Sequence, residues 1–174
     1  KDGRIEGRDG KEGIEGSEKT SAEYRLLELE RKVMVNPKPI KKEGVINVAV
    51  AGAGSFAQSV HLPNLQKLAE HYNIQAIVTR TGNNAKQIAK RFGANYCTTD
   101  YQEILQDDNV DIVLIATRHY LHAQMAMEAA KAGKAVFLEK PMALNQGELD
   151  ELVKVLKETQ VPFEPRQGRP VYCS

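Results

Sequence analysis

Tryptophan is absent from the 174-residue chain, and only 6% of the residues are aromatic. Proteins that bind single-stranded nucleic acid stack bases on aromatic side chains, so this scarcity argues against such a partner. The net charge of +1 gives no sign of the basic surface that attracts nucleic acid or an anionic membrane. The sequence also has no apolar run long enough to span a bilayer and no apolar signal-peptide core, so we expect no membrane partner and a cytoplasmic location.

Cysteine is nearly as scarce as tryptophan. The two cysteines, Cys97 and Cys173, have neither CxxC spacing nor the spacing of metal ligands. We therefore expect two free thiols in a reducing compartment and no metal site. The remaining composition, 41% hydrophobic and 27% charged, is ordinary for a globular protein with a packed core.

Charge is distributed unevenly along the chain. Residues 1–44 hold 21 of the 47 charged residues, which predicts a charged extension or linker. Within this extension, the apolar residues of 21–34 have the spacing of a helical stripe that begins at Ser21. The polar, proline-containing residues 164–174 predict an irregular tail, which leaves residues 45–163 as a single main domain.

In this main domain, short apolar runs alternate with amphipathic segments. We expect strands at residues 45–51, 74–78, 95–97, 110–116 and 135–138. We expect helices at residues 55–70, 83–92, 101–105, 119–132 and 144–159, the first of them interrupted or delayed by Pro63. Because strands that alternate with helices are joined by right-handed crossovers, the predicted fold class is α/β: a doubly wound parallel sheet, or Rossmann fold.

The turn between the first predicted strand and helix has the sequence Gly52-Ala53-Gly54-Ser55-Phe56-Ala57. Gly52 allows a tight turn, Gly54 lets the backbone approach a pyrophosphate, and Ala57 is small enough for close helix–strand packing. The helix N-terminus then offers free N–H groups and a partial positive charge to phosphates. This context favours dinucleotide binding over the alternative, a strand–helix turn without a ligand.

The end of the second predicted strand bears on the choice of cofactor. Domains specific for NAD place Asp or Glu there, where the carboxylate bonds the ribose 2′-hydroxyl. This chain has Thr79 followed by Arg80. A guanidinium without a neighbouring carboxylate suits a 2′-phosphate and can stack on adenine, so we favour NADP(H) over NAD(H). The alternative for Arg80 is an ordinary solvated surface arginine.

Several motifs make residues 46–163 similar to the N-terminal domain of the Gfo/Idh/MocA oxidoreductases. The glycine turn is followed by His61-Leu62-Pro63, as is frequent in that family. Residues 117–122 resemble the family's TPNxxH motif, with Arg118 and His119 in place of Pro and Asn. The stretch KAGKAVFLEKP is close to the family's AGKHVLCEKP, and its Glu139-Lys140-Pro141 is the most specific part of the match.

The resemblance implies positions for the cofactor-binding residues. Those expected around the pyrophosphate and nearby ribose are Gly52, Gly54, Ser55, Phe56 and Ala57. Those expected at the adenosine end are Thr79, Arg80 and Thr81. Those expected toward the nicotinamide are Thr117, Arg118, His122, Glu139, Lys140 and Pro141.

The resemblance also implies two catalytic residues. Glu139 would contact the cofactor ribose or amide, and Lys140 would reach the nicotinamide and the substrate hydroxyl. A lysine at the carboxyl end of a parallel strand projects into the ligand crevice, where it can stabilise developing alkoxide charge. Pro141 is a candidate cis proline that aims this loop. The alternative for Lys140 is a surface lysine in a turn.

The implied function is NAD(P)-dependent hydride transfer between the cofactor and a sugar or polyol-type alcohol. Members of the family carry the substrate pocket, and commonly the subunit interface, in a second domain. We expect this domain to lie outside the present chain, so the sequence allows a homo-oligomer but does not define its interface. The alternatives are a non-catalytic nucleotide-binding module and an S-adenosylmethionine methyltransferase, and Glu139-Lys140-Pro141 argues against the methyltransferase.

Overall fold

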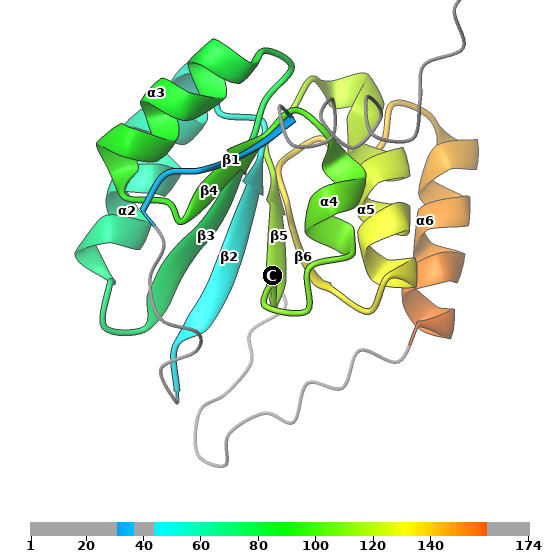
Figure 1. Cartoon of the computed structure of the whole chain (residues 1–174). Helices are drawn as coiled ribbons and strands as arrows, with labels where there is room; N and C mark the ends of the chain where they lie inside the picture. The colour runs from blue at the N-terminus through cyan, green and yellow to red at the C-terminus, as the bar shows by residue number, and fades with distance from the viewer. Residues whose placement is uncertain (1–30, 37–43, 160–174) are drawn as a thin grey trace, which may run out of the picture.

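A computed structural model describes residues 31–36 and 44–159 (Figure 1). The predicted tail 164–174, Cys173, and residues 21–30 of the predicted N-terminal helix lie outside these ranges. In the described part, six strands form one sheet in the order β1-β4-β3-β2-β5-β6. The strands are β1 (Lys32–Met34), β2 (Ile46–Ala51), β3 (Tyr72–Val78), β4 (Tyr96–Thr98), β5 (Ile112–Ile115) and β6 (Ala135–Leu138).

The five strands from β2 onward are all parallel, as predicted. From β2 the chain moves outward to β3 and β4, and then returns to the other side of β2 for β5 and β6. This is the doubly wound order of a Rossmann fold. The helices are η1 (Ala57–His61), α2 (Leu62–Lys67), α3 (Gly82–Phe92), α4 (Tyr101–Leu105), η2 (His119–Leu121), α5 (His122–Lys131) and α6 (Gln146–Glu158).

Helices cover both faces of the sheet, with α2 and α3 on one face and α4, α5 and α6 on the other (Figure 1). The central strand β2 supplies both cores because its side chains alternate between the two faces. Val48 and Val50 pack with the α2 and α3 side, and Ala49 and Ala51 pack with the α4, α5 and α6 side. A strand buried on both faces explains the apolar run at residues 48–51.

The N-terminal extension differs from the prediction at residues 32–34. They form the edge strand β1, antiparallel to β4, and not the end of a helix. Met34 is 56% exposed, whereas Val33 and Val35 pack against the core, so the local period is two and not 3.6. Without β1, the backbone groups on the outer side of β4 would be unpaired, and the pairing with β1 satisfies them. The sheet is therefore mixed.

The first helix after the glycine turn is irregular near Pro63, as predicted. Residues 57–61 are π-helical, and the α-helix α2 begins at Leu62. Pro63 has no N–H with which to continue a hydrogen-bond ladder, and it occupies the first turn of α2, where none is needed. The irregular turn ends at His61.

Within the described ranges, no helix is long and apolar enough to cross a membrane.

A polar network lies on the sheet face that α4 covers and centres on Asp107. Its carboxylate accepts hydrogen bonds from Gln75 Nε2 at 3.2 Å, Tyr96 Oη at 2.9 Å and the Asn109 backbone N–H at 2.9 Å. Burial by itself raises the pKa of Asp107, but the hydrogen bonds from Asn109, Gln75 and Tyr96 outweigh burial and lower it below its usual value. The ionised carboxylate therefore stabilises the fold.

We expect Asp107→Asn to lower the free energy of unfolding by about 1–3 kcal/mol, because the new amide nitrogen cannot accept the bonds that one carboxylate oxygen receives. The folded-state pKa is depressed, so this contribution is full at neutral pH. It shrinks as the pH falls below the ordinary carboxyl pKa of 3.8 and through the lower folded value. Urea unfolding of both proteins from pH 7 to pH 3 measures this. Asp108→Asn, at an exposed neighbouring site, is the control and should change stability by less than about 0.5 kcal/mol.

Candidate functional site

The carboxyl ends of the central strands meet at one edge of the sheet. The backbone N–H of Gly52, just after β2, donates to Val78 O at 2.9 Å at the end of β3. On the other side, Ala116 N donates to Ala51 O at 2.8 Å, and Glu139 N donates to Ile115 O at 3.0 Å. The strand ladder thus continues into the loops after β2, β5 and β6. In open α/β sheets, ligands bind at this edge, where the strand order reverses.

The two glycines of the turn have different surroundings. Gly52 has φ +87°, and a Cβ placed on it would lie 2.6 Å from Ala116 O and 2.7 Å from Thr117 N. The turn after β2 therefore packs directly on the backbone that follows β5, where no side chain fits. A Cβ on Gly54 would meet nothing within 4 Å. Gly52 closes the turn, and Gly54 leaves free space above it.

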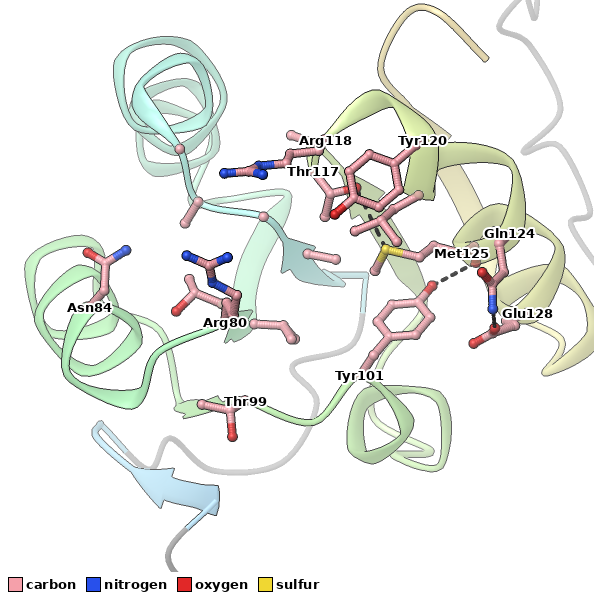
Figure 2. Close-up of a pocket in the computed structure, with 18 residues that line it drawn as sticks. Arg80, Asn84, Thr99, Tyr101, Thr117, Arg118, Tyr120, Gln124, Met125 and Glu128 are labelled. Carbon is pink, nitrogen blue, oxygen red and sulfur yellow. Dashed lines mark hydrogen bonds between the residues drawn. The ribbon is translucent and has the colours of Figure 1, made fainter. Parts of the chain in front are cut away.

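A pocket of about 700 Å³, called the larger pocket below, opens beside the turn (Figure 2). Its volume is in the range of small-molecule sites. It contains six of the predicted cofactor-binding residues, namely Gly52, Gly54, Thr79, Arg80, Thr117 and Arg118. The loops after β2, β3 and β5 therefore all contribute residues to the larger pocket.

Two arginines from different strands reach this pocket. Arg80 follows β3 and Arg118 follows β5, and Figure 2 shows their guanidinium groups turned toward the same part of the pocket. Asn84, in the first turn of α3, lines the pocket on the Arg80 side. From the sequence we expected Arg118 toward the nicotinamide, and in the structure it lines the same pocket as Arg80. The Thr79 hydroxyl donates to Thr81 O at 2.8 Å and so shapes the loop that carries Arg80.

Aromatic and thioether side chains form the opposite wall of the larger pocket, which we did not predict from the sequence. Tyr101 Oη donates to Met125 O at 2.8 Å, and Tyr120 is 61% exposed in the same region (Figure 2). Burial, followed by the charge of Glu128, raises the pKa of Tyr101, so its phenol stays protonated. This wall offers flat apolar surface to a ring.

A second pocket of about 220 Å³, the smaller pocket, lies on the other side of the turn. It is lined by Gly54, Phe56, Ala57, Ala116, Thr117, His119, His122, Glu139 and Lys140. Gly54, Ala116 and Thr117 line both pockets and so mark where they meet. Ser55, Thr81 and Pro141 line neither pocket. The Lys140–Pro141 peptide bond is cis, as predicted.

Two histidines contact the loop that carries Lys140. His61 Nε2 lies 2.7 Å from Glu139 Oε1, and these side chains are only 12% and 19% exposed. His122 is 1% exposed, with Nδ1 2.8 Å from Pro141 O and Nε2 3.1 Å from Thr117 O. The sequence indicated His122 as a cofactor-binding residue; it lines the smaller pocket, and both of its ring nitrogens face backbone carbonyl groups. The sequence did not indicate a site role for His61, because the partner of His61 is 78 residues away.

Comparison with known proteins agrees with this geometry. Residues 46–166 match the Gfo/Idh/MocA family, described as an oxidoreductase family with an NAD-binding Rossmann fold. A 4-carboxy-2-hydroxymuconate-6-semialdehyde dehydrogenase from Sphingobium is 33% identical over 66% of this chain and 36% of its own length. A myo-inositol 2-dehydrogenase from Thermotoga maritima is 28% identical over 67% of this chain and 34% of its own.

Solved structures give the same picture. The 3-ketoreductase KijD10 of Actinomadura kijaniata, determined with NADP and TDP-benzene, has a TM-score of 0.62 and 31% identity, covering 66% of this chain and 35% of its own. The dehydrogenase WlbA of Chromobacterium violaceum, determined with NADH and UDP-GlcNAcA, has a TM-score of 0.63 and 26% identity, covering 73% and 35%. The chain therefore spans about a third of the length of these relatives.

Proposed function

Because this chain belongs to the Gfo/Idh/MocA family of oxidoreductases, we propose that it binds a nicotinamide dinucleotide and forms the cofactor-binding part of a dehydrogenase or reductase. The observation that carries the proposal is the position of the glycine turn between two pockets, with Gly54, Ala116 and Thr117 common to both. A dinucleotide has two ends joined by a pyrophosphate, and this arrangement matches that shape. The helix that begins directly after Gly54 directs its first N–H groups and its positive end toward the pyrophosphate.

We assign the adenosine end of the cofactor to the larger pocket, and we propose that the chain binds NADP(H) in preference to NAD(H). Arg80 pairs with the ribose 2′-phosphate, and Asn84 lies beside it in the first turn of α3. No carboxylate stands at Thr79, where it would repel that phosphate. Tyr101 and Tyr120 supply flat surface for adenine, and Arg118 approaches the cofactor from the β5 side. One solved relative holds NADP and another NADH, so the preference rests on Arg80 itself.

We assign the nicotinamide end to the smaller pocket, where Glu139 and Lys140 lie. The bound cofactor would supply the hydride chemistry at this end. Lys140 would hold the oxygen of a substrate alcohol or carbonyl group and stabilise negative charge that develops on it. The substrate would be a sugar or polyol-type alcohol, because the relatives include an inositol dehydrogenase and an enzyme determined with a sugar nucleotide. Residues beyond this chain would complete the substrate pocket.

Calorimetric titration of the chain with NADPH, NADH and S-adenosylmethionine tests the proposal. We expect NADPH to bind with a dissociation constant at least about tenfold lower than that of NADH, because a charged hydrogen bond contributes about 1.5–3 kcal/mol. S-adenosylmethionine should give no heat of binding. If neither dinucleotide binds, the proposal is wrong. If the dinucleotides bind but the chain turns over no member of a panel of polyols and sugars, the result favours a non-catalytic nucleotide-binding module.

A further inference from the structure

The segment Glu139–Pro141 is anchored at both of its ends, by histidines from two different helical elements. His61 ends η1, which follows β2, and His122 begins α5, which follows β5. The segment itself follows β6, at the edge of the described sheet. Three loops that are far apart in the sequence are thereby joined beside the smaller pocket. Lys140 lies between the two anchored residues, and its side chain is exposed.

The His61 anchor is a side-chain contact held in place by aromatic rings. Its Nε2 donates to Glu139 Oε1 at 2.7 Å. The imidazole makes edge contacts with Phe56 at 5.2 Å and with Phe137 at 5.5 Å between ring centroids. Phe56 belongs to the same helical segment as His61, whereas Phe137 belongs to β6, the strand that leads to Glu139. Both phenylalanine rings are about half exposed, and the imidazole between them is only 12% exposed.

The His122 anchor is a backbone contact inside the protein. Its ring is 1% exposed, and its nitrogens lie 2.8 Å from Pro141 O and 3.1 Å from Thr117 O. The shorter of the two contacts, in which Nδ1–H donates to Pro141 O, ties the ring to the loop after β6. His122 therefore lies between this loop and the loop after β5, whose Thr117 lines both pockets.

We propose that His61 and His122 are positioning residues that form a two-point clamp on Glu139–Pro141 and so set the place of Lys140 at the smaller pocket. Neither histidine needs to touch the cofactor for this role. A functional side chain on a loop keeps its geometry only where neighbouring groups fix the backbone on which it stands. The inference rests on the proposed function, because it gives Lys140 its place beside the nicotinamide.

Amide side chains allow a sharp test, because each copies one nitrogen of the imidazole. The amide nitrogen of asparagine lies near the position of Nδ1, and that of glutamine lies near the position of Nε2. The Glu139 contact uses Nε2 of His61, whereas the Pro141 contact uses Nδ1 of His122. Glutamine should therefore replace His61 and asparagine should replace His122, and the opposite choices should fail.

The measurement is the NMR signal of the Lys140 side-chain ε-CH₂ group in the chain labelled with ¹³C-lysine and assigned with Lys140→Arg. In the wild-type chain, saturating NADP⁺ should shift this signal. His61→Gln and His122→Asn should keep most of the shift, and His61→Asn and His122→Gln should lose more than half of it. Thermal unfolding monitors folding, and the His61 pair alone decides the result if both His122 variants unfold.

The outcomes separate the two proposals. If calorimetry detects no NADP⁺ binding to the wild-type chain, the proposed function fails. If NADP⁺ binds without shifting Lys140, or if asparagine and glutamine behave alike at each position, the clamp is wrong and the histidines only fill space. The crossed pattern, with glutamine accepted at 61 and asparagine accepted at 122, supports the clamp, because a packing role would not depend on which nitrogen is kept.

Discussion

Gly52→Ala is expected to lower the free energy of unfolding by about 3 kcal/mol and to abolish dinucleotide binding. The positive φ of +87° costs alanine about 1–2 kcal/mol. Its Cβ would also stand 2.6 Å from Ala116 O, which is backbone and cannot rotate away. The chain after β5 must then move, and Thr117 moves with it. Urea unfolding and NADPH calorimetry on the variant measure both effects.

Gly54→Ala is the matched control, two residues along the same turn. Its Cβ would meet nothing within 4 Å, so we expect stability within about 0.5 kcal/mol of the wild type. The methyl group would nevertheless enter the space that we assign to the pyrophosphate, so binding should weaken while the fold is kept. Wild-type stability in Gly52→Ala would contradict the close approach of the β2 turn to the chain after β5.

Arg80→Ala is expected to weaken NADPH binding by about 10- to 100-fold, because the guanidinium–phosphate pair contributes about 1.5–3 kcal/mol. The affinity for NADH should fall by less than about threefold, since NADH has no 2′-phosphate and loses only a stacking contact. Calorimetric titration of both cofactors into the variant measures the ratio. The selectivity of the chain for NADPH should therefore nearly disappear.

Arg118→Ala controls for general loss of positive charge in the larger pocket. Arg118 lines the same pocket but follows β5, whereas the proposed phosphate contact follows β3. We expect its removal to weaken NADPH and NADH by similar factors and to leave their ratio unchanged. If Arg80→Ala also weakens both cofactors equally, Arg80 does not read the 2′-phosphate and the preference for NADP(H) is wrong.

The features predicted correctly from the sequence are those with a local signal. The buried parallel strands appear as apolar runs, and β6 has the predicted bounds, residues 135–138. The end of α3 at Gly93 follows from its left-handed φ of +72°, which a glycine adopts without strain. The edge strand β1 has no such signal, because Val33-Met34-Val35 also fits a helical stripe. Its pairing with β4 depends on residues more than 60 positions away in the sequence.

The same distinction separates the predicted and unpredicted parts of the site. The glycine turn, Arg80 and Glu139-Lys140-Pro141 are short motifs next to strand ends, and residues of each line one of two pockets that share Gly54, Ala116 and Thr117. The aromatic wall at Tyr101 and the contact of His61 with Glu139 join segments whose distance in the sequence hides their proximity. The contacts of His122 with two backbone carbonyl groups could not be predicted either, because the loops that carry Thr117 and Pro141 come together only in the fold.

A crystal structure of the chain with NADP⁺ tests the central claim most directly, because it shows which end of the cofactor lies in which pocket. We expect the 2′-phosphate within hydrogen-bond distance of Arg80, the pyrophosphate over Gly54, and the nicotinamide ring beside Lys140 in the smaller pocket. A cofactor bound in the reverse direction, or bound away from the glycine turn, would contradict the account.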